Sequence, residues 1–146
     1  MPGPASLRAQ QYYAHPQNLF WPIAGTACGF EAALPYAHRC AALVAAGIAL
    51  WDVLGSCRRE GAADASITLA DAVPNDLHGF LQRHGQVQRV LFNGALAEKV
   101  WRRRFGALPA DSRPQLLLIR LPSTSAANAA MSRGHRLATW LRALDR

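Results

Sequence analysis

Three short apolar runs, separated by segments with the composition of helices, constrain the fold of this chain most. The first of these runs is apolar on both faces, as strands are in a parallel sheet that is covered on both sides. We expect strands at residues 48–54, 87–92 and 116–121. We expect helices at residues 16–25, 34–46, 77–84 (with Asp76 as N-cap), 95–105 and 133–144. Because strands alternate with helices, the sequence predicts an α/β fold with a parallel sheet.

Polar residues stand near the ends of these predicted strands. Asp52 lies late in the first run, Asn93 and Gly94 follow the second, and Ser123, Thr124 and Ser125 follow the third. In parallel α/β sheets, ligands bind beyond the carboxyl ends of the strands. The segments 1–14, 55–66 and 109–114 are expected to be loops.

Length and charge narrow the class of protein. The 146 residues suit a single domain, residues 1–146, with a core of its own. The formal net charge is +7, and Lys99 is the only lysine among sixteen basic residues. The preference for arginine is typical of a GC-rich genome, but it does not explain the sign of the charge. A basic domain is attracted to polyanions, and nucleic-acid phosphates are their commonest form.

The sequence argues against a membrane protein, a secreted protein and a metal-binding protein. The apolar segment 41–50 is too short to span a membrane, and residues 1–20 lack the apolar core of a signal peptide. The cysteines, Cys28, Cys40 and Cys57, are widely spaced and form no CxxC pair. This spacing predicts neither a zinc site nor a disulfide framework, but buried thiols in a reducing cytoplasm. We therefore expect no metal and no cofactor.

The opening segment concentrates groups that can hold a planar heterocycle. Tyr12 and Tyr13 are followed by the pair His15-Pro16, and Asn18 stands just before Phe20 and Trp21. Aromatic rings stack on bases, while a histidine and an amide form hydrogen bonds with base edges or water.

This segment resembles the first motif of the hypoxanthine-DNA (deoxyinosine) glycosylases, in the uracil-DNA glycosylase superfamily. The matching residues are Met1-Pro2-Gly3, Ser6-Leu7 and Gln11 to Trp21, followed by Leu50 to Val53, Asn75-Asp76, Phe92-Asn93-Gly94 and Leu121 to Ser125. The resemblance implies a three-layer α/β sandwich with a short central parallel sheet. It also implies a first strand ahead of Met1, so we expect this domain to be N-terminally truncated.

The activity that the resemblance implies is that of a monofunctional DNA glycosylase in base excision repair of DNA damage. Such an enzyme flips a nucleotide out of the duplex and hydrolyses the N-glycosidic bond of a deaminated base. Hypoxanthine is the first candidate, with uracil and xanthine as others. The expected partner is DNA containing a deaminated base, with no membrane. We expect a monomer, cytoplasmic and nucleoid-associated, in a bacterium.

The alternative function is that of a non-catalytic nucleic-acid-binding relic of the same fold. A serine hydrolase using Ser123 or Ser125 would need a GxSxG elbow, which the sequence lacks.

The resemblance also implies roles for residues of the first motif. Asn18 is the candidate for orienting the attacking water, because Met1 occupies the place where the superfamily often has Asp or Asn. The alternative for Asn18 is that it braces the loop through backbone hydrogen bonds. Tyr13 is expected to stack on the flipped base, or else to belong to the core, whereas Phe20 and Trp21 are expected in the core.

The remaining candidates bind the base or the DNA backbone. His15 and Asp52 are candidates for hydrogen bonds to the base, with a structural histidine, and an N-cap or an ion pair with Arg58 or Arg59, as alternatives. Ser123, Thr124 and Ser125 resemble the second motif, which grips phosphates, so Ser123 is a candidate for both catalysis and DNA binding; a capping cluster is the alternative. Helpers expected from the same end of the chain are Asn128, which would hold this turn, and Arg133 and Arg136, which would contact DNA.

Overall fold

The computed structural model describes residues 2–59, 67–106 and 115–145, and its chain divides into two units. The helical unit comprises Pro2–Trp51 and Pro122–Arg146, and the sheet unit comprises Asp52–Leu121. The predicted loop at 109–114 and most of that at 55–66 lie outside the described residues. In the part that the structure describes, no helix is both long and apolar enough to cross a membrane.

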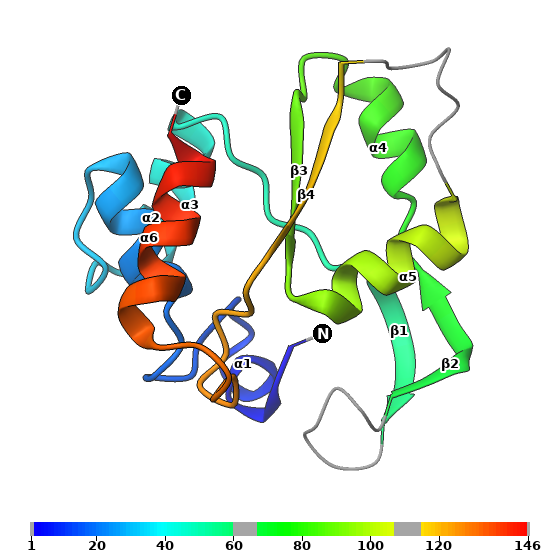
Figure 1. Cartoon of the computed structure of the whole chain (residues 1–146), viewed down its shortest axis with the longest axis horizontal. Coiled ribbons are helices and arrows are strands. Elements are labelled where there is room, and N and C mark those ends of the chain that lie inside the picture. Colours follow the sequence, from blue (N-terminus) through cyan, green and yellow to red (C-terminus); the bar gives the residue numbers. More distant parts are fainter. Residues whose placement is uncertain (1, 60–66, 107–114, 146) are drawn as a thin grey trace. The chain divides into compact units, whose positions relative to one another are not determined.

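The sheet unit contains the predicted parallel pair (Figure 1). Strands β3 (Arg89–Asn93) and β4 (Leu117–Leu121) are parallel and in register from Arg89 opposite Leu117 to Asn93 opposite Leu121. Helices α4 (Leu77–Arg83) and α5 (Ala95–Phe105) share a core with this pair. Phe92, Trp101, Leu77 and Leu81 form that core. The α/β class, both strands and both helices are therefore confirmed.

The carboxyl end of the pair is closed by a glycine. Gly94 has φ 95° and donates its N–H to the carbonyl of Leu121 at 3.0 Å. This backbone conformation is one that residues with a side chain rarely adopt, which explains a glycine after Asn93.

The first predicted strand is wrong. Residues 48–53 form no strand, and the first strand β1 (Leu54–Arg59) instead pairs antiparallel with β2 (Ile67–Pro74). Ile48 and Leu50 pack against the core of the helical unit, and Ile48 donates its N–H to the carbonyl of Leu43 at 2.9 Å. The run is therefore apolar because it covers helices. Residues 55–59, expected as loop, belong to β1.

The helical unit consists of α1 (Pro4–Ala9), α2 (Phe20–Cys28), α3 (Tyr36–Ala45) and α6 (Arg133–Leu144). In Figure 1, α2, α3 and α6 lie side by side. The buried centre of this unit is formed by Phe20, Trp21, Ala24 and Leu43. Helices α3 and α6 confirm the prediction, with α3 slightly shorter than expected.

Two predicted boundaries in the opening segment are wrong. Helix α1 occupies part of the expected loop at 1–14, because Gly3 and Pro4 form a favourable helix start. Helix α2 starts at Phe20 and not at Pro16. Residues 15–18 instead form a turn in which Asn18 donates its N–H to the carbonyl of His15 at 2.9 Å, as expected where Pro and Asn occur together.

Candidate functional site

The backbone of Tyr12 is fixed by two side chains from the helices of its own unit. Its N–H donates to the hydroxyl oxygen of Tyr36 at 3.1 Å, and its carbonyl accepts from Trp21 Nε1 at 2.9 Å. The Trp21 ring meets the Tyr36 ring edge-on at 5.8 Å between centroids. The segment between α1 and α2 is therefore held from both sides of its peptide chain.

The position of Tyr36 changes the pKa of its phenol. Burial raises the pKa of Tyr36 above its usual 10.0, and the neighbouring Cys40 raises it further, while the hydrogen bond from Tyr12 works in the opposite direction. The neutral phenol is therefore the favoured form in the folded protein.

Tyr13 has a strained backbone, and its ring packs against a core residue. Its φ is 54°, in the left-handed region that residues with a side chain rarely occupy. Its ring stacks on Phe20 with centroids 4.2 Å apart and planes inclined by 26°. Strain of this kind persists only where the surroundings fix the residue, and it is frequent at ligand sites. Phe20 is buried in the core, as predicted, and the Tyr12 ring lies with its centroid 6.2 Å from that of Tyr13. Stacking of Tyr13 on a flipped base stays a prediction.

Ser6, which the sequence analysis assigned no role, supports the same loop. Its side chain is buried, and its hydroxyl oxygen accepts from the N–H of Ala14 at 3.1 Å. Its carbonyl accepts from the N–H of Gln11 at 3.1 Å. The signal for this role was the place of Ser6 in the motif, ahead of the tyrosine pair.

Asn18 and His15 both form short-range bonds in the turn before α2. Asn18 Oδ1 accepts from the N–H of Phe20 at 2.9 Å, so the bracing contact expected as its alternative role is present. His15 is exposed, and its Nδ1 accepts from the N–H of Gln17 at 3.2 Å. An Nδ1 that accepts places the proton of the neutral ring on Nε2, which leaves a donor for a ligand.

The segment from Pro122 to Ser125, which we call the serine turn, has every carbonyl occupied. Trp140 Nε1 donates to Pro122 at 2.8 Å, Asn128 Nδ2 to Ser123 at 3.0 Å, and the N–H of Leu19 to Thr124 at 3.0 Å. The carbonyl of Ser125 accepts from Arg136 Nη1 at 2.8 Å. The expected bracing role of Asn128 is thereby confirmed.

The hydroxyls of the serine turn act as local caps. Ser123 Oγ accepts from the N–H of Ser125, and Ser125 Oγ from the N–H of Ala127, both at 3.2 Å. Thr124 is fully buried. The capping alternative is therefore present in the structure, although each serine O–H is left over by these bonds as a donor to a ligand.

The two motifs adjoin each other within the helical unit. The bond from Leu19 to Thr124 joins the residue after Asn18 to the middle of the serine turn. Phe20 also meets Trp140 edge-on at 6.3 Å between centroids. Figure 1 shows the segment after α1 beside the segment that leads into α6. Tyr13, Asn18 and the serine turn therefore share one region.

The arginines at the start of α6 differ in exposure. Arg133 is exposed in the first turn of the helix, where contact with DNA stays a prediction. Arg136 is 8% exposed and bonds to the serine turn, so its expected position at the surface is wrong. It was mispredicted because its position in the sequence does not reveal which face of α6 is buried.

Asp52 does not lie at the end of a strand. It precedes β1 in the sheet unit, and its carbonyl accepts from Asn75 Nδ2 at 2.7 Å. The expected position is wrong for the same reason as the first strand. Its role in reading a base stays a prediction, and the side chains of Arg58 and Arg59, its alternative partners, lie outside the described residues.

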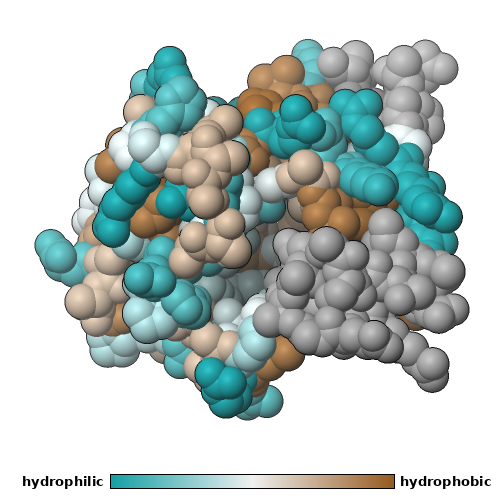
Figure 2. All heavy atoms as spheres, turned by 60° about the horizontal axis from the view of Figure 1, so that its bottom comes forward, coloured by the Kyte–Doolittle hydropathy of each residue, from teal (hydrophilic) through white to brown (hydrophobic). Residues whose placement is uncertain are grey.

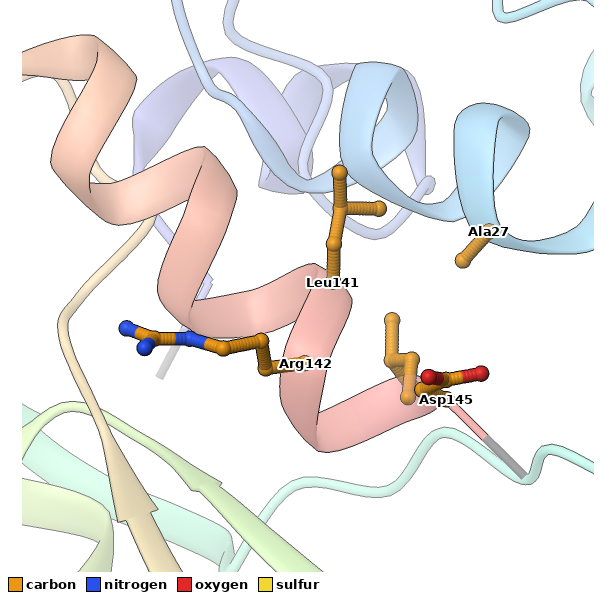
Figure 3. A pocket seen from close by; sticks show the side chains of 5 residues that line it. Ala27, Leu141, Arg142 and Asp145 are labelled. Carbon is orange, nitrogen blue, oxygen red and sulfur yellow. The ribbon is translucent and has the colours of Figure 1, made fainter.

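One hollow of the helical unit lies away from the predicted residues. It has a volume of about 470 Å³ and is lined by Ala27 of α2 and by Leu141, Arg142, Leu144 and Asp145 at the C-terminal end of α6. Figure 3 shows Leu141 directed toward α2, while Arg142 extends away from Ala27. The serine turn, by contrast, precedes the N-terminal end of α6.

One face of the molecule is mixed in hydropathy. On the face shown in Figure 2, small hydrophilic and hydrophobic patches alternate among the coloured residues. Within the described ranges, no group of three or more His, Cys, Asp or Glu side chains is placed to hold a metal ion.

Comparison with known proteins gives relatives of one kind. The hypoxanthine DNA glycosylase of Methanosarcina barkeri is 37% identical over 95 residues, which is 64% of this chain and 59% of that protein. The hypoxanthine DNA glycosylase of Methanosarcina acetivorans is 35% identical over 98 residues, 66% of this chain and 61% of that protein. The chain thus matches about 60% of the length of these curated relatives. No family model matches the chain.

A solved structure extends the comparison to nearly the whole chain. The solution structure of a proposed uracil DNA glycosylase from Methanosarcina acetivorans superimposes with a TM-score of 0.77 and 30% identity. The match covers 98% of this chain and 83% of that one. With the order of motifs, the fold and these relatives in agreement, the chain belongs to the uracil-DNA glycosylase superfamily, where it is similar to the hypoxanthine DNA glycosylases.

Proposed function

We propose that this protein is a DNA glycosylase that removes a deaminated base, hypoxanthine first, by hydrolysing its N-glycosidic bond. The observation that carries the proposal is the hydrogen bond from Leu19 to Thr124, which puts the tyrosine–asparagine segment and the serine turn in one place. The names of the relatives support the same activity. Uracil and xanthine are the other candidate bases.

Tyr13 is the candidate for stacking on the flipped base. Stacking of a base on an aromatic ring contributes about 1–3 kcal/mol and tolerates different bases. Selection among deaminated bases then depends on hydrogen bonds at the base edge, for which the Nε2 proton of His15 is one candidate donor.

Asn18 would orient the water that attacks the sugar. The bond from Phe20 N–H uses one lone pair of Asn18 Oδ1 and fixes the amide, and the second lone pair is left for a water. The transition state carries positive charge on the sugar, so a weakly basic group that positions water suffices. The bracing contact and the catalytic role are therefore compatible.

The serine turn would hold the DNA backbone on either side of the flipped nucleotide. Its carbonyls are all turned to donors of the protein, which removes their negative ends from the approaching phosphate. The hydroxyl groups of Ser123 and Ser125 would donate to phosphate oxygens, and Arg133 would add a charge from the start of α6.

The test is an excision assay on a panel of duplexes that differ in one base. End-labelled duplexes carry hypoxanthine, uracil, xanthine or the normal base at one position, and alkali cleaves the strand wherever a base has been lost. We expect cleavage of the hypoxanthine duplex and none of the normal one. Binding without cleavage of any deaminated duplex contradicts the proposal and supports a non-catalytic DNA-binding protein.

Substitutions of Asn18 test its role within this assay. Asn18→Ala should lower the rate of excision about 100-fold, on the scale of a lost catalytic positioning group, with little change in DNA binding. Asn18→Asp retains an acceptor for Phe20 and a lone pair for water, so excision should stay within about tenfold of wild type. Gln17→Ala, at an exposed neighbouring residue, is the control. If Asn18→Ala weakens binding as much as it slows excision, Asn18 is only a brace.

A further inference from the structure

Arg136 is a buried cation that forms no ion pair among the residues that the structure describes. Its side chain lies in α6 with 8% exposure, whereas Arg83 pairs with Asp76, and Arg102 and Arg120 pair with Glu98. Its Nε is buried without a hydrogen-bond partner. A charge that is withdrawn from water and left without a counter-ion is costly, and structures of this kind usually supply an anion.

The guanidinium lies directly behind the serine turn. Nη1 donates to the carbonyl of Ser125 at 2.8 Å and approaches that of Ser123 at 3.4 Å. One nitrogen thus spans both ends of the Ser123–Ser125 segment. Asn128 shares the carbonyl of Ser123, so the conformation of the turn and the position of the charge are fixed together.

We propose that Arg136 is the positioning residue of the serine turn and that its missing counter-ion is a phosphate of the bound nucleic acid. Arg136 holds the carbonyls inward and places a positive charge behind the turn, so that a phosphate on the outer side is attracted to the turn as a whole. This inference deepens the proposed function and rests on it for the choice of DNA as ligand. Arg136 acts through the turn and does not touch the base or the sugar.

Salt dependence of DNA binding separates this charge effect from a purely structural one. Each phosphate that a protein neutralises contributes about 0.9 to the slope of log affinity against log salt concentration. Arg136→Gln removes the charge and keeps a polar, though shorter, side chain. Its slope on an undamaged duplex should fall by about one, with affinity at low salt weaker by about tenfold.

Two further variants complete the comparison. Arg136→Lys keeps the charge, so its slope should equal that of wild type. Arg142→Gln removes an exposed arginine at the other end of the same helix and should leave the slope unchanged. A folded Arg136→Gln with the wild-type slope overturns the proposal, as does an Arg136→Lys variant whose slope falls equally.

A measurement on the wild-type chain keeps the test valid if Arg136→Gln does not fold. Inorganic phosphate is titrated into labelled protein, and amide and arginine Nε–H signals are followed by NMR. We expect the largest shifts at Ser123–Ala126 and at the buried Arg136 Nε–H. Shifts confined to other residues contradict the proposal.

Failure of this inference and failure of the proposed function are distinguishable. The slope is measured on undamaged DNA, where no base is excised. A protein that excises hypoxanthine with an unaltered slope in Arg136→Gln refutes only the role of Arg136. A protein that excises no base but shows the altered slope refutes only the glycosylase activity.

Discussion

At the scale of single residues, the tyrosine pair depends on one phenol from another helix. The Tyr36 hydroxyl accepts from the backbone N–H of Tyr12, and Tyr12 is followed directly by the strained Tyr13. Tyr36→Phe removes this acceptor from a half-buried N–H, which should lower the unfolding free energy by about 1–3 kcal/mol. Urea unfolding at neutral pH measures this loss, and an unchanged midpoint contradicts it.

The same phenol gives stability a dependence on alkaline pH. Burial raises the pKa of Tyr36 in the folded state above its unfolded value near 10, so the folded protein binds this proton more tightly. The resulting contribution is fully present below pH 10 and is lost as the pH rises through the folded-state pKa. Urea midpoints from pH 8 to 11 should therefore fall more steeply for wild type than for Tyr36→Phe. Parallel curves would refute the effect.

Residue types predicted which segments lie together better than they predicted which side chains are buried. The pattern of aromatics, Asn18 and serines locates a region that the structure brings together through Leu19 and Thr124. The structure also shows contacts that residue types do not encode, such as the role of Ser6 behind Ala14. The prediction that Arg136 lies at the surface was wrong for this reason, since burial on α6 depends on the serine turn that packs against it.

At the scale of elements, the predicted helix start at Asp76 is a local feature that the structure reproduces. Asp76 Oδ1 accepts from the N–H of Gly79 at 2.8 Å and caps α4. Asp76→Ala should cost about 1 kcal/mol of unfolding free energy, whereas Asp76→Asn keeps the acceptor and should cost a few tenths. Arg83→Gln is the control for the exposed ion pair of Asp76, which contributes little at 3.6 Å. Equal losses for Ala and Asn, measured by urea unfolding, would assign the effect to charge.

The missed strands show where local pattern stops being sufficient. An apolar run of seven residues at 48–54 fits a buried strand, but a segment that covers a helical core needs the same composition. Strand β2 went unpredicted because its partner β1 was expected to be loop, and an antiparallel hairpin is defined by its pairing. By contrast, β3 and β4 were predicted because each is followed directly by a clear stop, Gly94 or Pro122.

At the scale of the whole molecule, the charge of +7 determines how the DNA binding that we propose should depend on salt. Cationic side chains release the counter-ions that are condensed on the duplex. The slope of log affinity against log salt concentration therefore becomes more negative by about 0.9 for each phosphate contacted. For a footprint of about five phosphates we expect a slope of about −4.5, so that a fourfold rise in salt weakens binding roughly 500-fold. Because phosphate contacts carry no sequence information, undamaged and deaminated duplexes should give the same slope. Fluorescence anisotropy between 50 and 200 mM salt measures the slope for both duplexes. A slope near zero would exclude backbone phosphates as the main source of affinity.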